Sequence, residues 1–144
     1  MRATLLLLAL VLVTLALSSC GAASGITSLP AATSGDAVFA KAFTDHADCL
    51  EVQGQGPVQK LLSDDVTGER HQRFIVKLAS GQTLLIAHNI DVAQRVQGLQ
   101  VGDTVAFKGE YVWNAQGGLV HWTHRDPGGS HAAGWIEYQG KTYQ

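Results

Sequence analysis

The sequence is poor in cysteine, in clustered basic residues and in long apolar runs, and each shortage excludes a class of protein. It contains two cysteines, and its ten basic and twelve acidic residues give a formal net charge of −2. The basic residues are scattered, which argues against a strong nucleic-acid binder, because such proteins carry a basic stripe. The longest apolar run, Ala3 to Leu17, is shorter than the roughly 20 residues that span a bilayer.

The apolar run instead has the features of a secretory signal, since it follows the basic Arg2 and ends in small residues. Its last four residues, Leu17-Ser18-Ser19-Cys20, resemble a bacterial lipobox, in which the cysteine is lipidated. The alternative is a plain signal with a chance cysteine. Gly21, not aspartate, follows Cys20, which favours the outer membrane. We therefore expect a signal over 1–19 and a lipid anchor on Cys20 that attaches an exported protein to the outer membrane, facing the periplasm.

The rest of the chain divides into a tether and one domain. Residues 20–35 are mostly Gly, Ala, Ser and Thr, a composition typical of flexible linkers. Residues 36–144 are enough for one small domain. With Cys20 lipidated, Cys49 has no intrachain partner. We interpret it as a half-buried small residue, with a catalytic thiol near His46 as the alternative.

The domain begins with a helix over 36–47, where apolar residues share one face, and continues as strands and turns. The predicted strands are 50–62, 71–78, 83–88, 104–113, 119–124 and 134–138, with a short helix over 90–96. The first strand contains Gly54, Gly56 and Pro57, which predict a sharp bend. This order favours a mainly β, OB-like Greek-key barrel. The alternatives are an irregular β-sandwich and an SH3-like barrel.

Two predicted hairpins each place histidines at a strand end. A turn on Ser80-Gly81 would pair Val76 with Leu85, Phe74 with Ala87 and Arg73 with His88. A turn over 114–118 would set Tyr111 near His121 and Lys108 near His124. The candidate ligand-binding residues are His71, Arg73, His88, Asn89, Tyr111, His121, Trp122 and His124.

A first hypothesis for this region is a divalent metal site. The candidate ligands are His121, His124, His131 and Asp126, because histidine and carboxylate ligands suit zinc. Three residues along a straight strand place His121 and His124 on opposite faces, so a shared metal requires a bend near Thr123. The alternative is that these histidines bond to backbone and to Asp126 and fix an irregular loop.

A second hypothesis is a thermonuclease-like phosphodiesterase. In such enzymes carboxylates on an OB barrel hold calcium and arginines stabilise phosphoryl charge. Asp64, Asp65, Arg70 and Arg73 flank the first predicted strand, 50–62, and the loop after it. Paired aspartates in a glycine-containing loop are also ordinary turn residues.

A third hypothesis is binding without catalysis, because OB barrels bind oligonucleotides and oligosaccharides on one face. Aromatic residues are dense in the last third of the chain: Tyr111, Trp113, Trp122, Trp135 and Tyr138. They either line a groove or pack in the core. The negative charge favours a small ligand, a glycan or an envelope peptide or protein over nucleic acid.

Four segments of the domain resemble a family of small exported bacterial proteins known as domain of unknown function 3465. They are residues 70–74, 87–91, 109–114 and 121–124, the last followed by Asp126-Pro127. The family has no assigned activity, so the resemblance implies an exported domain and nothing about a substrate. The sequence as a whole favours ligand binding in the cell envelope, with a metal-dependent hydrolase as the alternative.

Overall fold

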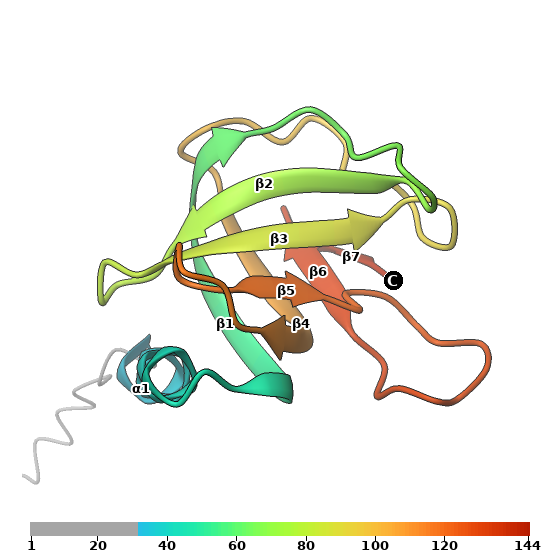
Figure 1. Ribbon diagram of the computed structural model, residues 1–144. Helices are drawn as coiled ribbons and strands as arrows, with labels where there is room; N and C mark the ends of the chain where they lie inside the picture. The colour runs from blue at the N-terminus through green and yellow to red at the C-terminus, as the bar shows by residue number, and fades with distance from the viewer. Residues whose placement is uncertain (1–31) are drawn as a thin grey trace, which may run out of the picture.

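The computed structural model describes residues 32–144, which form one helix and seven strands (Figure 1). The helix α1 spans Ala32–Thr44. The strands are β1 (Asp48–Leu61), β2 (His71–Lys77), β3 (Thr83–Asn89), β4 (Thr104–Val112), β5 (Leu119–His121), β6 (Trp135–Tyr138) and β7 (Lys141–Tyr143). The predicted signal, Cys20 and tether residues 21–31 lie outside the described residues. Within 32–144, no helix has the length and apolar character needed to cross a bilayer.

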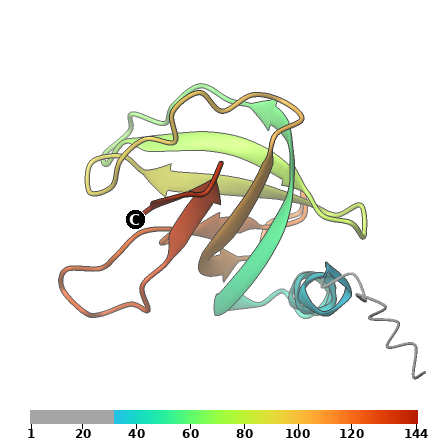
Figure 2. The same ribbon diagram turned by 180° about the vertical axis from the view of Figure 1, so that it is seen from behind.

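Five of the strands close into a barrel in the order β1-β2-β3-β5-β4, and β1 pairs with β4 to complete the ring. The β3–β5 pair is parallel and the other pairs are antiparallel. This topology confirms the predicted OB-like barrel. The hairpin of β6 and β7 extends the sheet from β4, as the rear view shows (Figure 2).

Strand β1 serves both halves of the barrel because it bends at its glycines. Residues 48–57 pair with β4, and Val58 onward pairs with β2. A Cβ atom at Gly54 would lie 2.8 Å from the ring of Phe39, and one at Gly56 would lie 2.3 Å from the Lys77 carbonyl oxygen. The bend predicted from Gly54, Gly56 and Pro57 is therefore confirmed, and both glycines are required by close packing.

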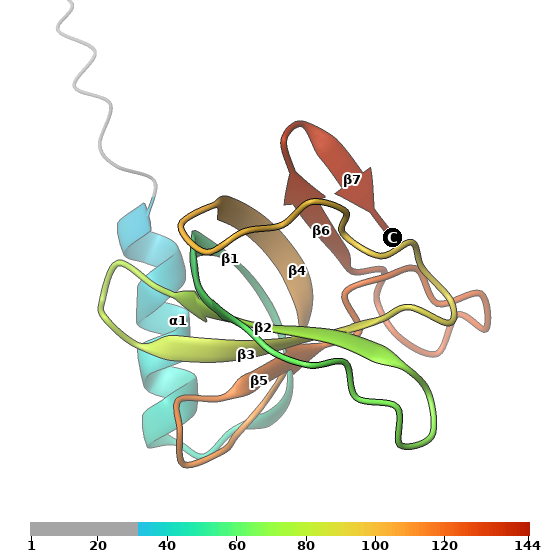
Figure 3. The ribbon, with the colours of Figure 1, turned by 90° about the horizontal axis from the view of Figure 1, so that it is seen from above.

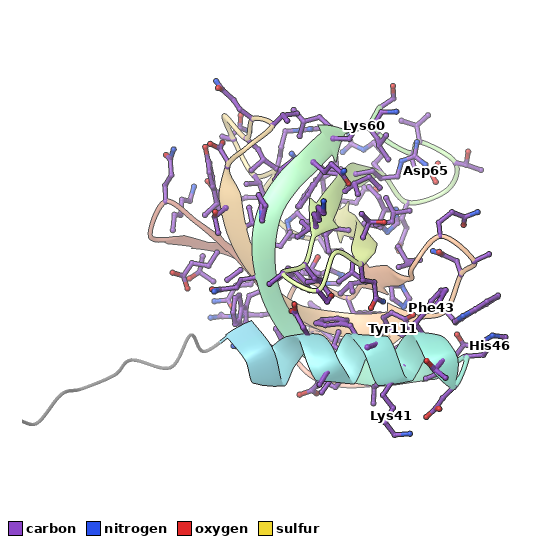
Figure 4. All side chains as sticks on the ribbon, turned by 90° about the vertical axis from the view of Figure 1, so that its left-hand side faces the viewer. Lys41, Phe43, His46, Lys60, Asp65 and Tyr111 are labelled. Carbon is purple, nitrogen blue, oxygen red and sulfur yellow. The ribbon has the colours of Figure 1, made fainter. Side chains whose placement is uncertain are left out.

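Alternate residues of the strands fill the barrel, as the period of two requires. Phe74, Val76 and Leu78 are buried, as their predicted common face implies. Helix α1 lies across one end of the barrel (Figures 3 and 4). Its Phe39 closes that end, with its ring centroid 6.0 Å from the ring of Phe107 and 6.3 Å from that of Tyr111.

Several predicted elements differ from the structure. The segment 90–96 is a run of turns and bends, not a helix, and β5 ends at His121, not at residue 124. Residues 32–35, assigned to the tether, begin α1. Cys49 is exposed, not half-buried, because β1 has an irregularity there and Cys49 adopts a φ of 56°.

Both predicted hairpin registers are wrong by one residue. In the first hairpin Phe74 pairs with Ile86 and Gln72 with His88. The Leu78 amide donates to the Gln82 carbonyl, so the loop has three residues, with Gly81 at φ 91°. A three-residue loop shifts the pairing relative to a two-residue turn.

In the second hairpin Tyr111 pairs with Val120, and Glu110 pairs with His121. Its turn is organised by Asn114, whose side-chain oxygen accepts from the amides of Gln116 and Gly118. The shift places Glu110, which is not among the predicted site residues, beside His121.

Candidate functional site

Two of the predicted ligand-binding residues, His88 and Tyr111, lie inside the barrel. His88 is fully buried, with Nε2 3.0 Å from the Gln94 carbonyl and Nδ1 2.9 Å from Thr123 Oγ1. Because a carbonyl only accepts, Nε2 carries the proton and Nδ1 accepts from the threonine hydroxyl. Burial lowers the pKa of His88 to about 4. The Tyr111 hydroxyl donates to the Gly117 carbonyl.

Three other predicted residues bond to nearby parts of the chain. Asn89 is buried and donates to Glu69, and His71 Nδ1 lies 2.8 Å from the Glu69 carbonyl. His124 is also buried, with Nδ1 2.7 Å from the Arg125 carbonyl. These contacts agree with the alternative in which the histidines fix local structure.

Glu110, His121, Trp122 and His131 form what we call the histidine cluster. His121 Nε2 lies 3.3 Å from one carboxylate oxygen of Glu110, and His131 Nδ1 lies 3.3 Å from the other. The His131 ring stacks on Trp122 with centroids 3.7 Å apart. Burial lowers the pKa of His121, and the Glu110 carboxylate partly opposes that shift.

Close backbone packing holds the cluster in place. Trp122 has a φ of 50°, a strained conformation for so large a residue. This kink at Trp122 ends β5. A Cβ at Gly109 would lie 2.2 Å from the His121 carbonyl, and one at Gly134 would lie 1.9 Å from the Trp122 carbonyl. Asp126 accepts from the amides of Gly128, Ser130 and His131, which lowers the pKa of its carboxyl.

The predicted metal ligands are not brought together as a set. His121 and His131 share Glu110, but His124 bonds to the Arg125 carbonyl and Asp126 orders its own loop. Across residues 32–144, no group of three or more His, Cys, Asp or Glu side chains has a metal-holding arrangement. The chain does bend as a shared site requires, but at Trp122.

The residues of the thermonuclease-like hypothesis form ion pairs. Asp64 pairs with Arg95, and Arg70 pairs with Asp91. Asp65 accepts from the Thr67 amide, which lowers its pKa, and lies 4.0 Å from Arg73. The carboxylates are thus satisfied by protein donors.

The outer face of the barrel carries three adjoining hollows, of about 210, 180 and 480 Å³. The first lies beside Arg73 and Arg95, and it shares Leu62 with the second. The second shares Thr83 and Gln116 with the third, which reaches α1. Because neighbouring hollows share lining residues, we treat them as one groove.

The groove runs from the β1–β2 loop and residues 95–99 of the β3–β4 segment, across β2 and β3, to the β4–β5 loop and α1. In the side view, Asp65 marks the loop end and Phe43 the α1 end (Figure 4). Among the predicted ligand-binding residues, Arg73 lines the groove. The other lining residues include Arg95, Phe43 and two threonines, and the rest are aliphatic, small or amide residues, types that carry no sequence signal of their own.

Together, the closed five-strand barrel, the helix across its end and the groove on its outer face define a small OB-like domain with a candidate binding face. The chain belongs to the family described as protein of unknown function DUF3465, whose model matches residues 21–144. This result confirms the resemblance seen in the sequence. No curated protein matches the chain.

Among solved structures, the chain is similar to the hypothetical protein ygiW from E. coli. The two sequences are 23% identical, and the match has a TM-score of 0.38. It covers 56% of this chain and 77% of that one.

Proposed function

We propose that this protein is an exported, lipid-anchored domain that binds a ligand of the bacterial cell envelope in the groove. The observation that carries the proposal is that the three hollows follow one another along β2 and β3 and share lining residues. OB barrels bind oligomeric ligands on this face, between the β1–β2 and β4–β5 loops.

The chemistry of the groove favours binding over hydrolysis. None of the described residues that line it is Asp, Glu, His or Cys. These are the side chains that most often act as nucleophiles or exchange protons with a substrate. Arginine, amide and aliphatic side chains instead hold and orient a ligand.

The predicted histidine surface is a second candidate place for the same role. His121 and His131 are partly exposed, as is His71. Their bonds to Glu110 and to the Glu69 carbonyl use one ring nitrogen each. The role of these residues in binding stays a prediction, and the binding experiment below separates them from the groove.

The binding experiment uses the full chain purified in detergent and three probes: muropeptides, chitotetraose and a mixed peptide library. Affinity is measured by calorimetry. We expect one probe to bind, and Ile75→Asn in the groove to weaken it at least tenfold. The matched control, Val92→Asn, changes an exposed valine that does not line the groove and leaves affinity unchanged.

A result in which His121→Ala abolishes binding and Ile75→Asn does not would move the site to the histidine cluster. The proposal of a binding domain fails if none of the probes binds the folded protein at millimolar concentration.

The anchor is tested separately. Cys20→Ser should abolish incorporation of labelled palmitate and release the protein from the membrane fraction. Incorporation that persists in this variant would contradict lipidation at Cys20.

A further inference from the structure

We infer that the occupant of the groove is an extended acidic peptide, whose carboxylate binds beside Arg73 and whose aliphatic side chain enters the hollow at Ile75 and Leu85. The inference rests on the proposed function and specifies its ligand. It follows from the different chemistry of the three hollows.

The first hollow offers a cation with free hydrogen-bond donors. Arg73 Nε donates to the Ser63 carbonyl, which fixes the guanidinium at the edge of the hollow. Arg73 Nη1 forms a long ion pair with Asp65 at 4.0 Å, which is beyond hydrogen-bond distance, so among the described residues its terminal nitrogens have no hydrogen-bond partner. A guanidinium with two free terminal nitrogens fits a carboxylate in bidentate geometry.

Arg95 adds a second positive charge to the same hollow, but Asp64 already pairs with it. Arg95 is hydrogen-bonded to Asp64, whereas Arg73 lies 4.0 Å from Asp65 with no hydrogen bond between them, so Arg73 is the principal binding group. The pairing of Arg95 with Asp64 also predicts that loss of the Asp64 charge strengthens the attraction for an acidic ligand.

The middle hollow favours an aliphatic side chain over a sugar. Leu62, Ile75 and Leu85 line it together with polar residues such as Asn114 and Gln116. A sugar ring binds best against an exposed aromatic face, and among residues 32–144 no aromatic side chain lines this hollow. Phe43, the one aromatic residue of the groove, lies in the third hollow and stacks on Trp113.

The hollow next to α1 is suited to a backbone. Its lining includes Ala40, Gly81, Ala115 and Gly117. Such small residues allow close approach of another chain. The order along the groove is therefore a carboxylate site, an aliphatic site and a wider hollow where small residues let main chain approach closely.

The experiment measures binding of fluorescent acetylated peptide amides to the full chain in detergent. Each peptide is built of alanine and serine with one leucine and one glutamate, separated by one to five residues. A matched set replaces the glutamate with glutamine, and chitotetraose is the neutral glycan probe.

We expect the best glutamate peptide to bind at least tenfold more tightly than its glutamine partner. Arg73→Gln should remove this preference. Arg73→Lys should keep part of it, because lysine retains the positive charge but not the planar pair of N–H donors of a guanidinium. Arg70→Gln is the matched control, since Arg70 pairs with Asp91 and does not line the groove. Asp64→Asn should raise the affinity of the glutamate peptide two- to fivefold.

Equal affinity for glutamate and glutamine peptides, or a preference that survives Arg73→Gln, would overturn the inference. In another outcome, chitotetraose binds, Ile75→Asn abolishes that binding, and neither peptide binds. This outcome would overturn the inference and leave the proposed function intact. Failure of both peptides and the muropeptide and chitotetraose probes would overturn both proposals. Thermal melting of each variant shows that it is folded.

Discussion

The histidine cluster and the groove lie on the same barrel, and they differ in how their polar groups are used. In the histidine cluster, Glu110 bonds to two imidazoles, and Trp122 stacks on one of them. In the groove, Arg73 keeps its terminal nitrogens free and the middle hollow is lined by aliphatic residues. The polar groups of the histidine cluster bond to one another and stabilise the fold, whereas the groove has hydrogen-bond donors and apolar surface that a ligand can contact.

This difference shows why residues that are conspicuous in a sequence need not form the binding site. A histidine placed at a strand end must find a partner when it is buried, because an unpaired buried polar group costs about 1–3 kcal/mol. His88 and His124 find theirs in Thr123 and in backbone carbonyls. The comparison makes four predictions, given from the largest expected effect to the smallest.

Gly109→Ala should destabilise the protein by about 3 kcal/mol or more, because its new methyl group would meet the His121 carbonyl, which is backbone and cannot rotate away. Urea unfolding measures the change. The control is Gly98→Ala: Gly98 has open space around it and a φ of 72°, so only the backbone strain remains, about 1 kcal/mol. Equal losses for the two variants would contradict close packing beneath the histidine cluster.

His88 should make the protein less stable in acid. Its pKa is about 4 in the folded protein and near 6.5 when unfolded, so the unfolded state takes up a proton that the folded state does not. Its contribution is fully present above pH 6.5 and is lost as the pH falls to about 4, at roughly 1.4 kcal/mol per pH unit and about 3 kcal/mol in total.

The measurement is urea unfolding at several pH values in this window. His88→Gln should show a flatter dependence of unfolding free energy on pH than the unchanged protein. His71→Gln serves as the control, because His71 lies on the barrel surface. Parallel curves for the unchanged protein and His88→Gln would show that the buried imidazole does not govern acid stability.

Glu110→Gln should cost at most about 1 kcal/mol, because partly exposed ion pairs contribute little. The variant should still raise the mobility of the His131 ring, measured by side-chain NMR relaxation, since it removes the shared carboxylate. Glu137→Gln, an exposed glutamate on β6, is the control. A loss well above 1 kcal/mol would mean that the histidine cluster is a main source of stability.

Gln116→Ala should change the unfolding free energy by less than about 0.5 kcal/mol, because it removes an exposed side chain. The same change should weaken binding in the groove, where Gln116 lines two hollows. Calorimetry with the best glutamate peptide measures this effect, and Gln55→Ala on the exposed face of β1 is the control. If stability falls while binding does not, Gln116 is a structural residue.

Much of the fold could be predicted because it depends on short-range patterns. The alternation of Phe74, Val76 and Leu78 gave the inward face of β2 and of the residue that follows it, and Gly54 and Gly56 marked the bend of β1. The predicted contact between Arg73 and His88 is wrong because the two side chains lie on opposite faces of the sheet. Directly paired residues point to the same side of a sheet, but Arg73 points outward and His88 points inward.

The candidate site could be predicted only in part. Arg73 was selected because it is charged and near a strand end, and it does line the groove. Glu110 was missed because a loop one residue longer or shorter shifts the register of the β4–β5 hairpin. That shift decides whether Glu110 or Tyr111 pairs with His121. The aliphatic lining of the groove gives no local signal, since Leu62 and Leu85 look like any strand residue until the strands are brought together.

The sequence by itself determined the succession of the barrel strands along the chain, the bend of β1 and membership of the family, because alternation, glycine positions and motifs are written along the chain. Only the tertiary structure decided which polar groups are satisfied and which are free. Hydrogen-bond partners such as Thr123 for His88 and Ser63 for Arg73 come from distant segments or adjoining strands. A partner's position depends on register and loop length, and these are set when the barrel closes.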